Sequence, residues 1–302
     1  MGIIFRNHRC KCGKISKVIF AKPAGSFSIF KTNMSLQNIK AFYNSTGVET
    51  DRLDQHVFQL EKTRSQQIIR EYLQPGMIIA DIGGATGSYS FWLHDMGQEV
   101  HLLDVAEYHI ETAIKISKEK NKPLGSILLG DARSLPYPDN QFDLILLFGP
   151  LYHLQQKTDR IGAITEARRV LKPNGVLLAA TISRYASLLD GFWQNYIDDA
   201  GFEKIIEQDL THGNHFNTTG NPFYFTEAYF HSQVEIEEEF TLGGFANISI
   251  KAIEGFGWLV PGFINRWNDD AWRRKLLHYI QQTESDPVMI GISAHIMTVA
   301  IK

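Results

Sequence analysis

The chain has little cysteine, and what it has lies at one end. Its 302 residues contain two, Cys10 and Cys12, so nothing from Gly13 onward can form a disulfide or a thiolate metal site. That usage is typical of a reducing compartment. No apolar run approaches the roughly 18 residues of a membrane span. We therefore expect a cytoplasmic globular protein, a monomer or homodimer, with no membrane partner.

The first 33 residues lack acidic side chains altogether. They hold seven Lys or Arg, which leaves 23 basic and 33 acidic residues in the rest of the chain, a formal net charge of −10. His8, Cys10 and Cys12 offer three metal ligands where structural zinc needs four, so we expect no metal. The segment is Lys-rich and has no continuous apolar core, which disfavours a targeting peptide. We expect residues 1–33 to be a disordered, dispensable extension and residues 34–302 to be the working domain.

A glycine-rich turn after a buried strand is the most informative feature. The sequence MIIADIGGATGSYS spans 77–90, and a helical pattern follows over 89–96. A strand, an acid, glycines and a helix N-terminus are how an α/β sheet makes a nucleotide pocket. The acid is Asp81, and the glycines are Gly83, Gly84 and Gly87.

This turn does not fit the dinucleotide fingerprint G-x-G-x-x-G. Counted from Gly83, the third position is Ala85 and the sixth is Ser88. An acid placed before the first glycine suits a ligand with an ammonium group or a cation better than one that presents a pyrophosphate.

Further strands alternate with helices along the chain. Residues 99–103 predict a second strand that ends at Asp104, 23 residues after Asp81 and near the offset at which a carboxylate meets ribose hydroxyls. Residues 126–129, 142–148 and 176–181 predict three more strands, with a helix over 158–171 that stops at KPNG. Residues 247–253 and 293–301 predict the last two. The alternation indicates an α/β, doubly wound, Rossmann-like sheet of seven strands, mostly parallel.

Taken together, these motifs resemble the class I S-adenosylmethionine-dependent methyltransferases. DIGGATG is similar to their cofactor loop, Asp104 to their ribose acid, GDARSLPYPDNQFDLI to their adenine-side motif, and EARRVLKPNG to the turn before strand five. The resemblance spans residues 64–181. It implies S-adenosylmethionine as cofactor and an antiparallel last strand. It also implies these cofactor-binding residues: Asp81, Gly83, Gly84, Ala85, Gly87, Asp104, Val105, Asp131, Ala132, Phe148 and Gly149.

A narrower resemblance, over residues 42–302, is to a bacterial subgroup of small, stand-alone methyltransferases. FGPLYHL, ISRYASLLDG, FTEAYFHS, EGFGWLVPGF and GISAHIMTVA carry it. It implies that the N-terminal helical segment 34–74, with Tyr43 and His56, closes over cofactor and substrate. Ala85 departs from the family's middle glycine. We expect φ of Ala85 to stay negative and binding to be kept.

The catalytic and substrate-binding candidates lie after strands four and five. His153 follows strand four directly and is the first candidate for a base or orienter, with Tyr152 second. The long aromatic stretch 183–240 is expected to form a helical lid and substrate insertion, although many of its aromatics should build a satellite core. The substrate-binding candidates are Tyr43, Arg184, Tyr185, Tyr224, Tyr229 and His231.

Several substrates can be argued against. The domain has no thiol for 5-methylation of cytosine, and residues 149–152 (GPLY) replace the [D/N]-P-P-[Y/F/W] motif of amino-group nucleic-acid methylases. A body of net charge −10 matches a polyanion poorly, so we expect no nucleic-acid partner. Methylation of an O, N or C atom of a small molecule remains. Alternatives are a non-catalytic protein that binds S-adenosylmethionine as a sensor or partner subunit, and an RNA or protein methyltransferase anchored by the basic tail.

Overall fold

The computed structural model describes residues 58–302. These belong to the larger of the two units into which the chain divides, Asn33–Lys302. The expectations for the basic extension, for residues 34–57 of the N-terminal helical segment, and for Tyr43 and His56 fall outside the described residues. Within the described part, no helix has the length and apolar character to cross a membrane.

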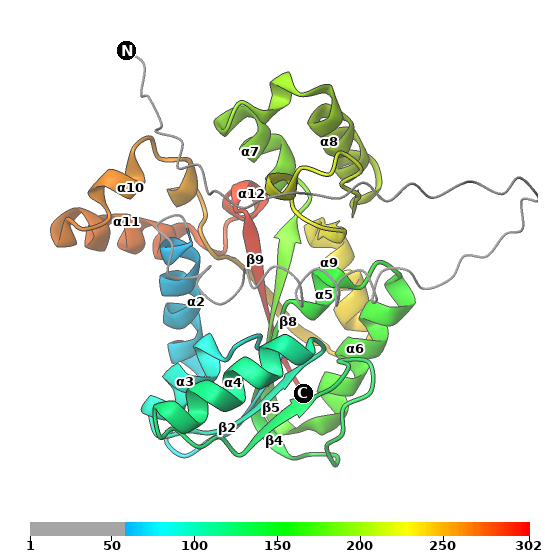
Figure 1. The fold of residues 1–302 in the computed structure, drawn as a ribbon, viewed down its shortest axis with the longest axis vertical. Helices are drawn as coiled ribbons and strands as arrows, with labels where there is room; N and C mark the ends of the chain where they lie inside the picture. Colours follow the sequence, from blue (N-terminus) through cyan, green and yellow to red (C-terminus); the bar gives the residue numbers. More distant parts are fainter. Residues whose placement is uncertain (1–57) are drawn as a thin grey trace, which may run out of the picture. The chain divides into compact units, whose positions relative to one another are not determined.

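A central sheet runs through this unit (Figure 1). Its nine strands among the described residues are β1 Ile78–Ile82, β2 Glu99–Asp104, β3 Ser126–Leu129, β4 Phe142–Phe148, β5 Leu171–Ser183, β6 Asn214–His215, β7 Ala228–His231, β8 Asn247–Ala252 and β9 His295–Ile301. The α-helices are α2 Gln59–Tyr72, α3 Ser88–Asp95, α4 Glu107–Glu119, α5 Pro150–His153, α6 Lys157–Val170, α7 Ala186–Trp193, α8 Ala200–His212, α9 Gln233–Leu242, α10 Phe263–Arg266, α11 Asp270–Thr283 and α12 Pro287–Ile292.

The principal strands lie in the order β3-β2-β1-β4-β5-β9-β8. The first five are parallel, and β9 is antiparallel to both of its neighbours. This confirms the predicted mostly parallel, doubly wound sheet with an antiparallel last strand. The predicted helix stop also holds: α6 ends at Val170, and the β4–β5 register jumps from Leu171 to Val176, so that the four residues between them bulge out of the ladder.

Two short strands were not predicted. β7 pairs in parallel with Ile182 and Ser183 of β5. Because Ile182 also pairs with β9 on its other edge, β7 lies on the β4 side of β5, beyond the point where Phe148 ends the β4 pairing. The segment 183–240 therefore extends the sheet past β4. β6 has two residues, which is too short for a periodic pattern to reveal it.

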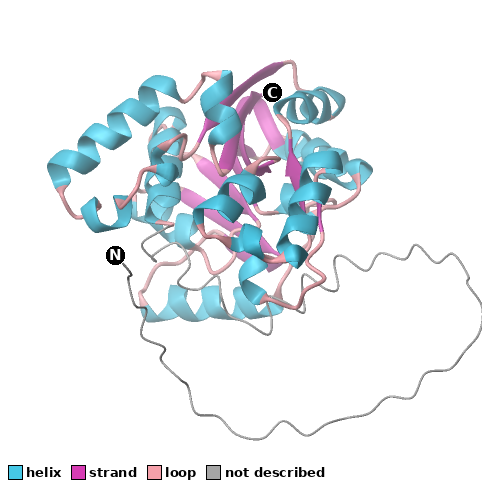
Figure 2. Cartoon of the chain, turned by 90° about the horizontal axis from the view of Figure 1, so that it is seen from above, coloured by secondary structure: helices cyan, strands magenta, loops and turns pink. Residues whose placement is uncertain are grey.

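Helices cover both faces of the sheet (Figure 2). Successive side chains of a strand point to opposite faces. Ala80 and Ile82 accordingly pack into one core cluster with α6 and α9, whereas Ile79 packs into another with α2 and α3. Burial on both faces explains the nearly all-apolar sequence of β4.

The segment 183–240 has a small core of its own. Phe202, Ile205, Ile206 and Tyr224 are buried together, with residues of α7 and the following turn packed against them. The predicted helical character of this insertion and its satellite core are therefore present. Its action as a lid is taken up below as a proposal.

Candidate functional site

One cavity opens where the parallel strands β1, β2 and β4 end. Its wall includes Asp81 and Ile82 of β1, Asp104 of β2 and Phe148 of β4. Ligands of doubly wound sheets bind at this edge because loops, and not strand ladders, line it. The cavity also reaches Ala180 of β5 and residues of α2 and β9.

Two glycines of the predicted turn are required by close packing. A Cβ on Gly83, whose φ is 78°, would lie 2.6 Å from Pro150 Cδ and 2.7 Å from the Phe148 carbonyl oxygen. A Cβ on Gly84 would lie 2.6 Å from Asp81 Oδ2. The Gly83 amide donates to the Leu103 carbonyl at 2.7 Å, which fastens the turn to β2. The turn is therefore a tight cradle of backbone beside the cavity.

Ala85 corrects one expectation. Its φ is 48°, in the left-handed region that L-residues rarely adopt, so the expectation of a negative φ is wrong. The Ala85 amide donates to Asp104 Oδ2 at 2.9 Å, and this hydrogen bond helps to hold the residue there.

Asp81 is fully buried at the end of β1. Its Oδ2 accepts a hydrogen bond from the Ser90 hydroxyl at 2.6 Å, and its buried Oδ1 has no hydrogen-bond partner among the described residues. Burial raises the pKa of Asp81 to about 6, with Ser90 opposing the shift and the charge of Asp104 adding to it. A buried, partly unsatisfied carboxylate on a cavity wall is suited to a ligand that brings an N–H donor or a positive charge.

Asp104 is also held by the chain. Its Oδ1 accepts from the Ala106 amide at 2.9 Å and lies 3.0 Å from His109 Nδ1. His109 lines the cavity and was not predicted. Its place five residues after the strand-end acid, in the first turn of α4, is the feature of the sequence that could have revealed it.

Of the other predicted cofactor residues, Gly87 does not line the cavity and the rest do. The carboxylate of Asp131 is engaged twice by Arg133, at 3.0 Å from Nε and 2.6 Å from Nη2. Gly87 does not line the cavity, since its Cβ position faces the Phe91 ring at 2.8 Å. The remaining predicted residues on the wall are Gly83, Gly84, Ala85, Val105, Asp131, Ala132, Phe148 and Gly149.

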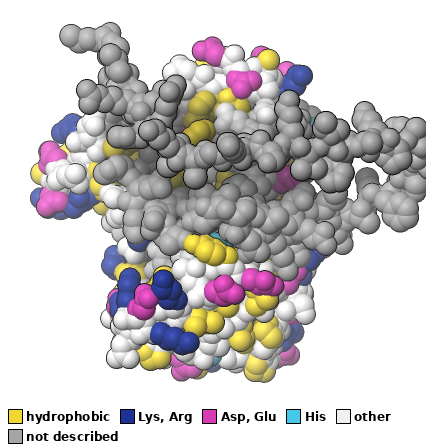
Figure 3. All heavy atoms as spheres, viewed as in Figure 1, with side chains coloured by type: hydrophobic (Ala, Val, Ile, Leu, Met, Phe, Trp, Pro, Cys, Tyr) yellow, Lys and Arg dark blue, Asp and Glu magenta, His cyan; other side chains and the backbone are white. Residues whose placement is uncertain are grey.

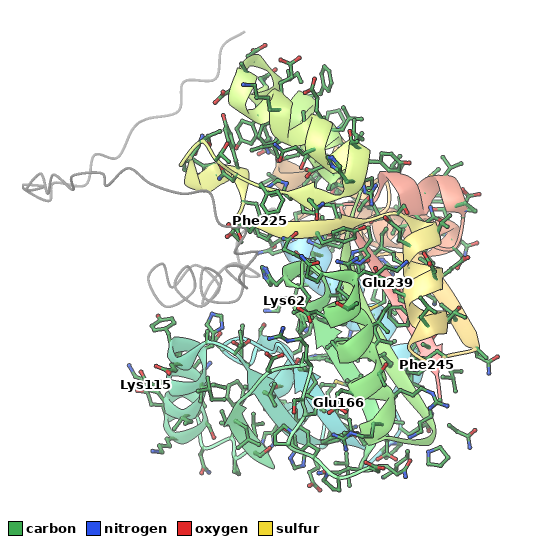
Figure 4. The ribbon with its side chains drawn as sticks, turned by 90° about the vertical axis from the view of Figure 1, so that its right-hand side faces the viewer. Lys62, Lys115, Glu166, Phe225, Glu239 and Phe245 are labelled. Carbon is green, nitrogen blue, oxygen red and sulfur yellow. The ribbon has the colours of Figure 1, made fainter. Side chains whose placement is uncertain are left out.

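The two catalytic candidates share this cavity. Tyr152 and His153 lie on α5, which begins directly after Gly149, and both are on the wall. The His153 ring is 4.7 Å from the Tyr152 ring and stacks at 6.1 Å on Phe225 of the insertion. Figure 4 shows Phe225 below α7 and α8. The insertion therefore meets the cavity wall at His153.

Five substrate-binding candidates do not line this cavity, and most have partners within the chain. Arg184 donates to Glu235 at 2.5 Å, and the Tyr229 hydroxyl donates to the same carboxylate at 2.7 Å. His231 is buried 3.3 Å from Glu239. Tyr224 donates to Asp199 at 2.8 Å within the α7–α8 core. Tyr185 is 45% exposed.

Four residues at the far end of the cavity are not among the predicted site residues. Glu61 and Ser65 of α2, Ile253 after β8 and His295 of β9 are on the wall. They come from three distant parts of the chain, so no local spacing relates all four.

Comparisons with known proteins agree with this geometry. Residues 80–179 match the family model Methyltransf_11, a methyltransferase domain. The Shewanella sediminis protein named "Ubiquinone/menaquinone biosynthesis C-methyltransferase UbiE" is 34% identical over 120 residues, which are 37% of this chain and 45% of that protein. The chain thus matches less than half the length of such curated relatives.

Solved structures share the fold. A Pyrococcus horikoshii protein is 17% identical, with a TM-score of 0.57 over 86% of this chain and 98% of its own. A S-adenosylmethionine-dependent methyltransferase of Methanosarcina mazei is 20% identical, with a TM-score of 0.52 over 78% of this chain and 96% of its own. At these identities the likeness concerns the fold alone.

Proposed function

We propose that this chain, whose residues 80–179 form a class I S-adenosylmethionine-dependent methyltransferase domain, transfers a methyl group to an O, N or C atom of a small molecule. The observation that carries the proposal is the shared cavity. It joins the Asp81 carboxylate, the glycine cradle and Asp104 to Tyr152 and His153.

The residues of the cradle fit the cofactor. Asp81 offers a buried acceptor for the ammonium group, the backbone at Gly83 and Gly84 permits close approach, and Asp104 faces the cavity as the ribose acid. Asp131 and Ala132 lie on the wall assigned to adenine. When bound, S-adenosylmethionine supplies an electrophilic methyl group on a sulfonium. The protein must then orient the acceptor and exclude water.

We assign Tyr152 and His153 to the acceptor side. Both follow β4, and the contact of His153 with Phe225 links this side to the insertion. Segment 183–240 would act as a lid that closes over the acceptor. It should then be protected from hydrogen exchange when S-adenosylhomocysteine and acceptor are both bound, and less with cofactor product alone.

A small-molecule acceptor agrees with the charge of the chain. Acidic and basic side chains are interspersed over the part of the face in Figure 3 where α3 and α4 lie, which gives no single-sign field there for a polyanion. The partial likeness to a protein named as a C-methyltransferase supports keeping carbon among the candidate acceptor atoms.

The experiment is incubation of the full chain with metabolite extract and isotope-labelled S-adenosylmethionine, followed by mass spectrometry. We expect label in one or a few small molecules. Calorimetry should show binding of S-adenosylhomocysteine and none of NAD. Binding without any transfer would favour the non-catalytic sensor, and NAD binding without either adenosyl ligand would refute the cofactor assignment.

Two glycine variants serve as a matched pair for the binding test. Gly83→Ala and Gly76→Ala both place a side chain at a positive φ, 78° and 73°. Only the first brings the new Cβ against Pro150 and Phe148, because Gly76 has nothing within 4 Å of that position. Gly83→Ala should therefore lose S-adenosylhomocysteine binding, while Gly76→Ala keeps it.

A further inference from the structure

A third histidine of the cavity wall, besides His109 and His153, is paired with a buried acid. His295 is the first residue of β9, and its Nδ1 lies 2.6 Å from Oε1 of Glu254, which is 4% exposed. Glu254 follows β8. Both residues lie in motifs of the narrower resemblance, EGFGWLVPGF and GISAHIMTVA, but no role was predicted for either, and 41 positions separate them along the chain.

The Glu254 carboxylate is held in place by further donors. Its Oε2 lies 2.9 Å from Ser293 Oγ and accepts from the His295 amide at 2.9 Å. The Ser293 hydroxyl oxygen in turn accepts from the Glu254 and Gly255 amides at 3.1 and 3.0 Å. The pair is therefore preorganised by the junction of β8 and β9.

This geometry selects one form of the imidazole. An ionised carboxylate only accepts hydrogen bonds, so Nδ1 of His295 must carry the hydrogen that points at Glu254. The lone pair of the neutral ring is then on Nε2. A histidine oriented in this way by a carboxylate is the arrangement that general-base catalysis uses.

We propose that His295 is the general base that takes a proton from the methyl acceptor, and that Glu254 is its positioning residue. The proposal rests on the proposed function. The X–H bond of the acceptor breaks and its proton goes to His295 Nε2. The freed electron pair forms the bond to the methyl carbon as the carbon–sulfur bond of the sulfonium breaks toward sulfur. His153 keeps an orienting role.

The proposal narrows the class of acceptor. A base is needed only where the nucleophile carries a proton at neutral pH, as a hydroxyl or an acidic C–H does. The protein should therefore methylate an oxygen or carbon atom that must first lose a proton, and not an amine nitrogen whose lone pair is already unprotonated. Glu61 of α2 also faces this group, since one oxygen of it lies within 4.8 Å of the ligand atoms of Glu254 and His295.

The first test needs no acceptor. Nitrogen-15 NMR of the full chain with S-adenosylhomocysteine should show His295 as the Nδ1–H tautomer, and Glu254→Gln should shift it toward a mixture. A mixed tautomer in the wild type would overturn the assignment. The same samples are titrated with Mn²⁺ and Zn²⁺, because Glu61, Glu254 and His295 could together hold a metal ion. Metal binding that requires all three side chains would also overturn the assignment of His295 as the general base.

The second test uses labelled methyl transfer to the acceptor found in extract. His295→Asn should lower turnover by about 10²-fold or more and remove the acid limb of the pH profile, with S-adenosylhomocysteine affinity within about twofold. Glu254→Gln should give a smaller loss of the same kind. His278→Asn, an exposed histidine of α11, is the matched control and should match the wild type.

Three results would count against the base. In the first, the turnover of His295→Asn equals that of the wild type. In the second, His295→Asn loses S-adenosylhomocysteine affinity by as large a factor as turnover. In the third, His153→Asn removes the acid limb of the pH profile and His295→Asn does not. If the wild type itself transfers no labelled methyl group, the proposed function is wrong, and the assignment of His295 as a general base is then wrong as well.

Discussion

The two ends of the cavity are built in different ways. At the β1–β2 end, Asp81, the turn at Gly83 and Gly84, and Asp104 lie within 24 residues, and the backbone itself forms the wall. At the other end, Glu61 and His295 line the wall and Glu254 contacts His295, and the three come from distant parts of the chain. A local motif specifies the first end. The second exists only once tertiary contacts have formed.

A buried ion pair joins α9, in which the insertion 183–240 ends, to α6. Arg160 of α6 contacts Glu239 of α9 through Nε and Nη2, at 2.6–3.0 Å, and both side chains are 2% exposed. Glu239 is labelled in Figure 4. Although burial alone raises the pKa of Glu239, hydrogen bonds from His231 and Arg160 outweigh it and lower the pKa below the usual value.

The largest expected effect comes from breaking that pair. Arg160→Met leaves the buried Glu239 carboxylate with His231 but without the Arg160 guanidinium, so the free energy of unfolding should fall by about 3–5 kcal/mol. Lys157→Met is the control, since Lys157 and Glu238 pair at 2.7 Å on the same two helices but are 43% and 53% exposed. It should cost under about 1 kcal/mol. Urea denaturation measures both, and equal losses would show that burial is not what matters.

At the β1–β2 end of the cavity, the expected change in the free energy of unfolding has the opposite sign. The raised pKa of Asp81 means that the native state keeps this proton to higher pH than the unfolded chain does. Its contribution to stability is complete below about pH 4 and is lost as pH rises through about 6. Asp81→Asn has no charge to bury, so at pH 7 it should be more stable than the wild type by up to about 3 kcal/mol.

This second prediction is measured as the difference in urea stability between variant and wild type from pH 4 to pH 7. The difference should vanish toward pH 4, and S-adenosylhomocysteine binding should weaken despite the gain in stability. A difference that does not change with pH would mean that Asp81 is ionised at no cost. The predicted combination is expected of a residue kept for its ligand and not for the fold.

The same contrast explains what the sequence could predict. The seven principal strands, α3, α6 and the cofactor turn followed from apolar periodicity, Gly83, Gly84 and the KPNG stop, all of which act over a few residues. The Ala85 conformation was predicted wrongly because its amide hydrogen bond to Asp104 reaches across 19 residues. The Glu254–His295 and Arg160–Glu239 pairs span 41 and 79 residues, and no spacing rule relates such positions.

Asp104, the proposed ribose acid, offers a smaller test of the motif end. Asp104→Asn keeps the size of the side chain but removes its charge, so charge-assisted hydrogen bonds to the ribose hydroxyls weaken. Affinity for S-adenosylhomocysteine should fall about tenfold, which corresponds to about 1.4 kcal/mol. Calorimetry measures it, with Asp95→Asn at the exposed Asp95–Lys122 pair as the control. An unchanged dissociation constant would make Asp104 a purely structural strand end.

The smallest expected effect lies within the turn itself. Ala85 has φ of 48°, where an L-residue is strained and glycine is not, so Ala85→Gly should stabilise the protein by about 0.5–1 kcal/mol. Ala106 is the matched control, because its amide also donates to Asp104 but its φ is −96°. Ala106→Gly should destabilise instead, since it loses a buried methyl group and adds unfolded-state freedom. Thermal denaturation should move in opposite directions for the two variants. A lower melting temperature for Ala85→Gly would show that the Asp104 hydrogen bond, and not strain, dominates at this residue.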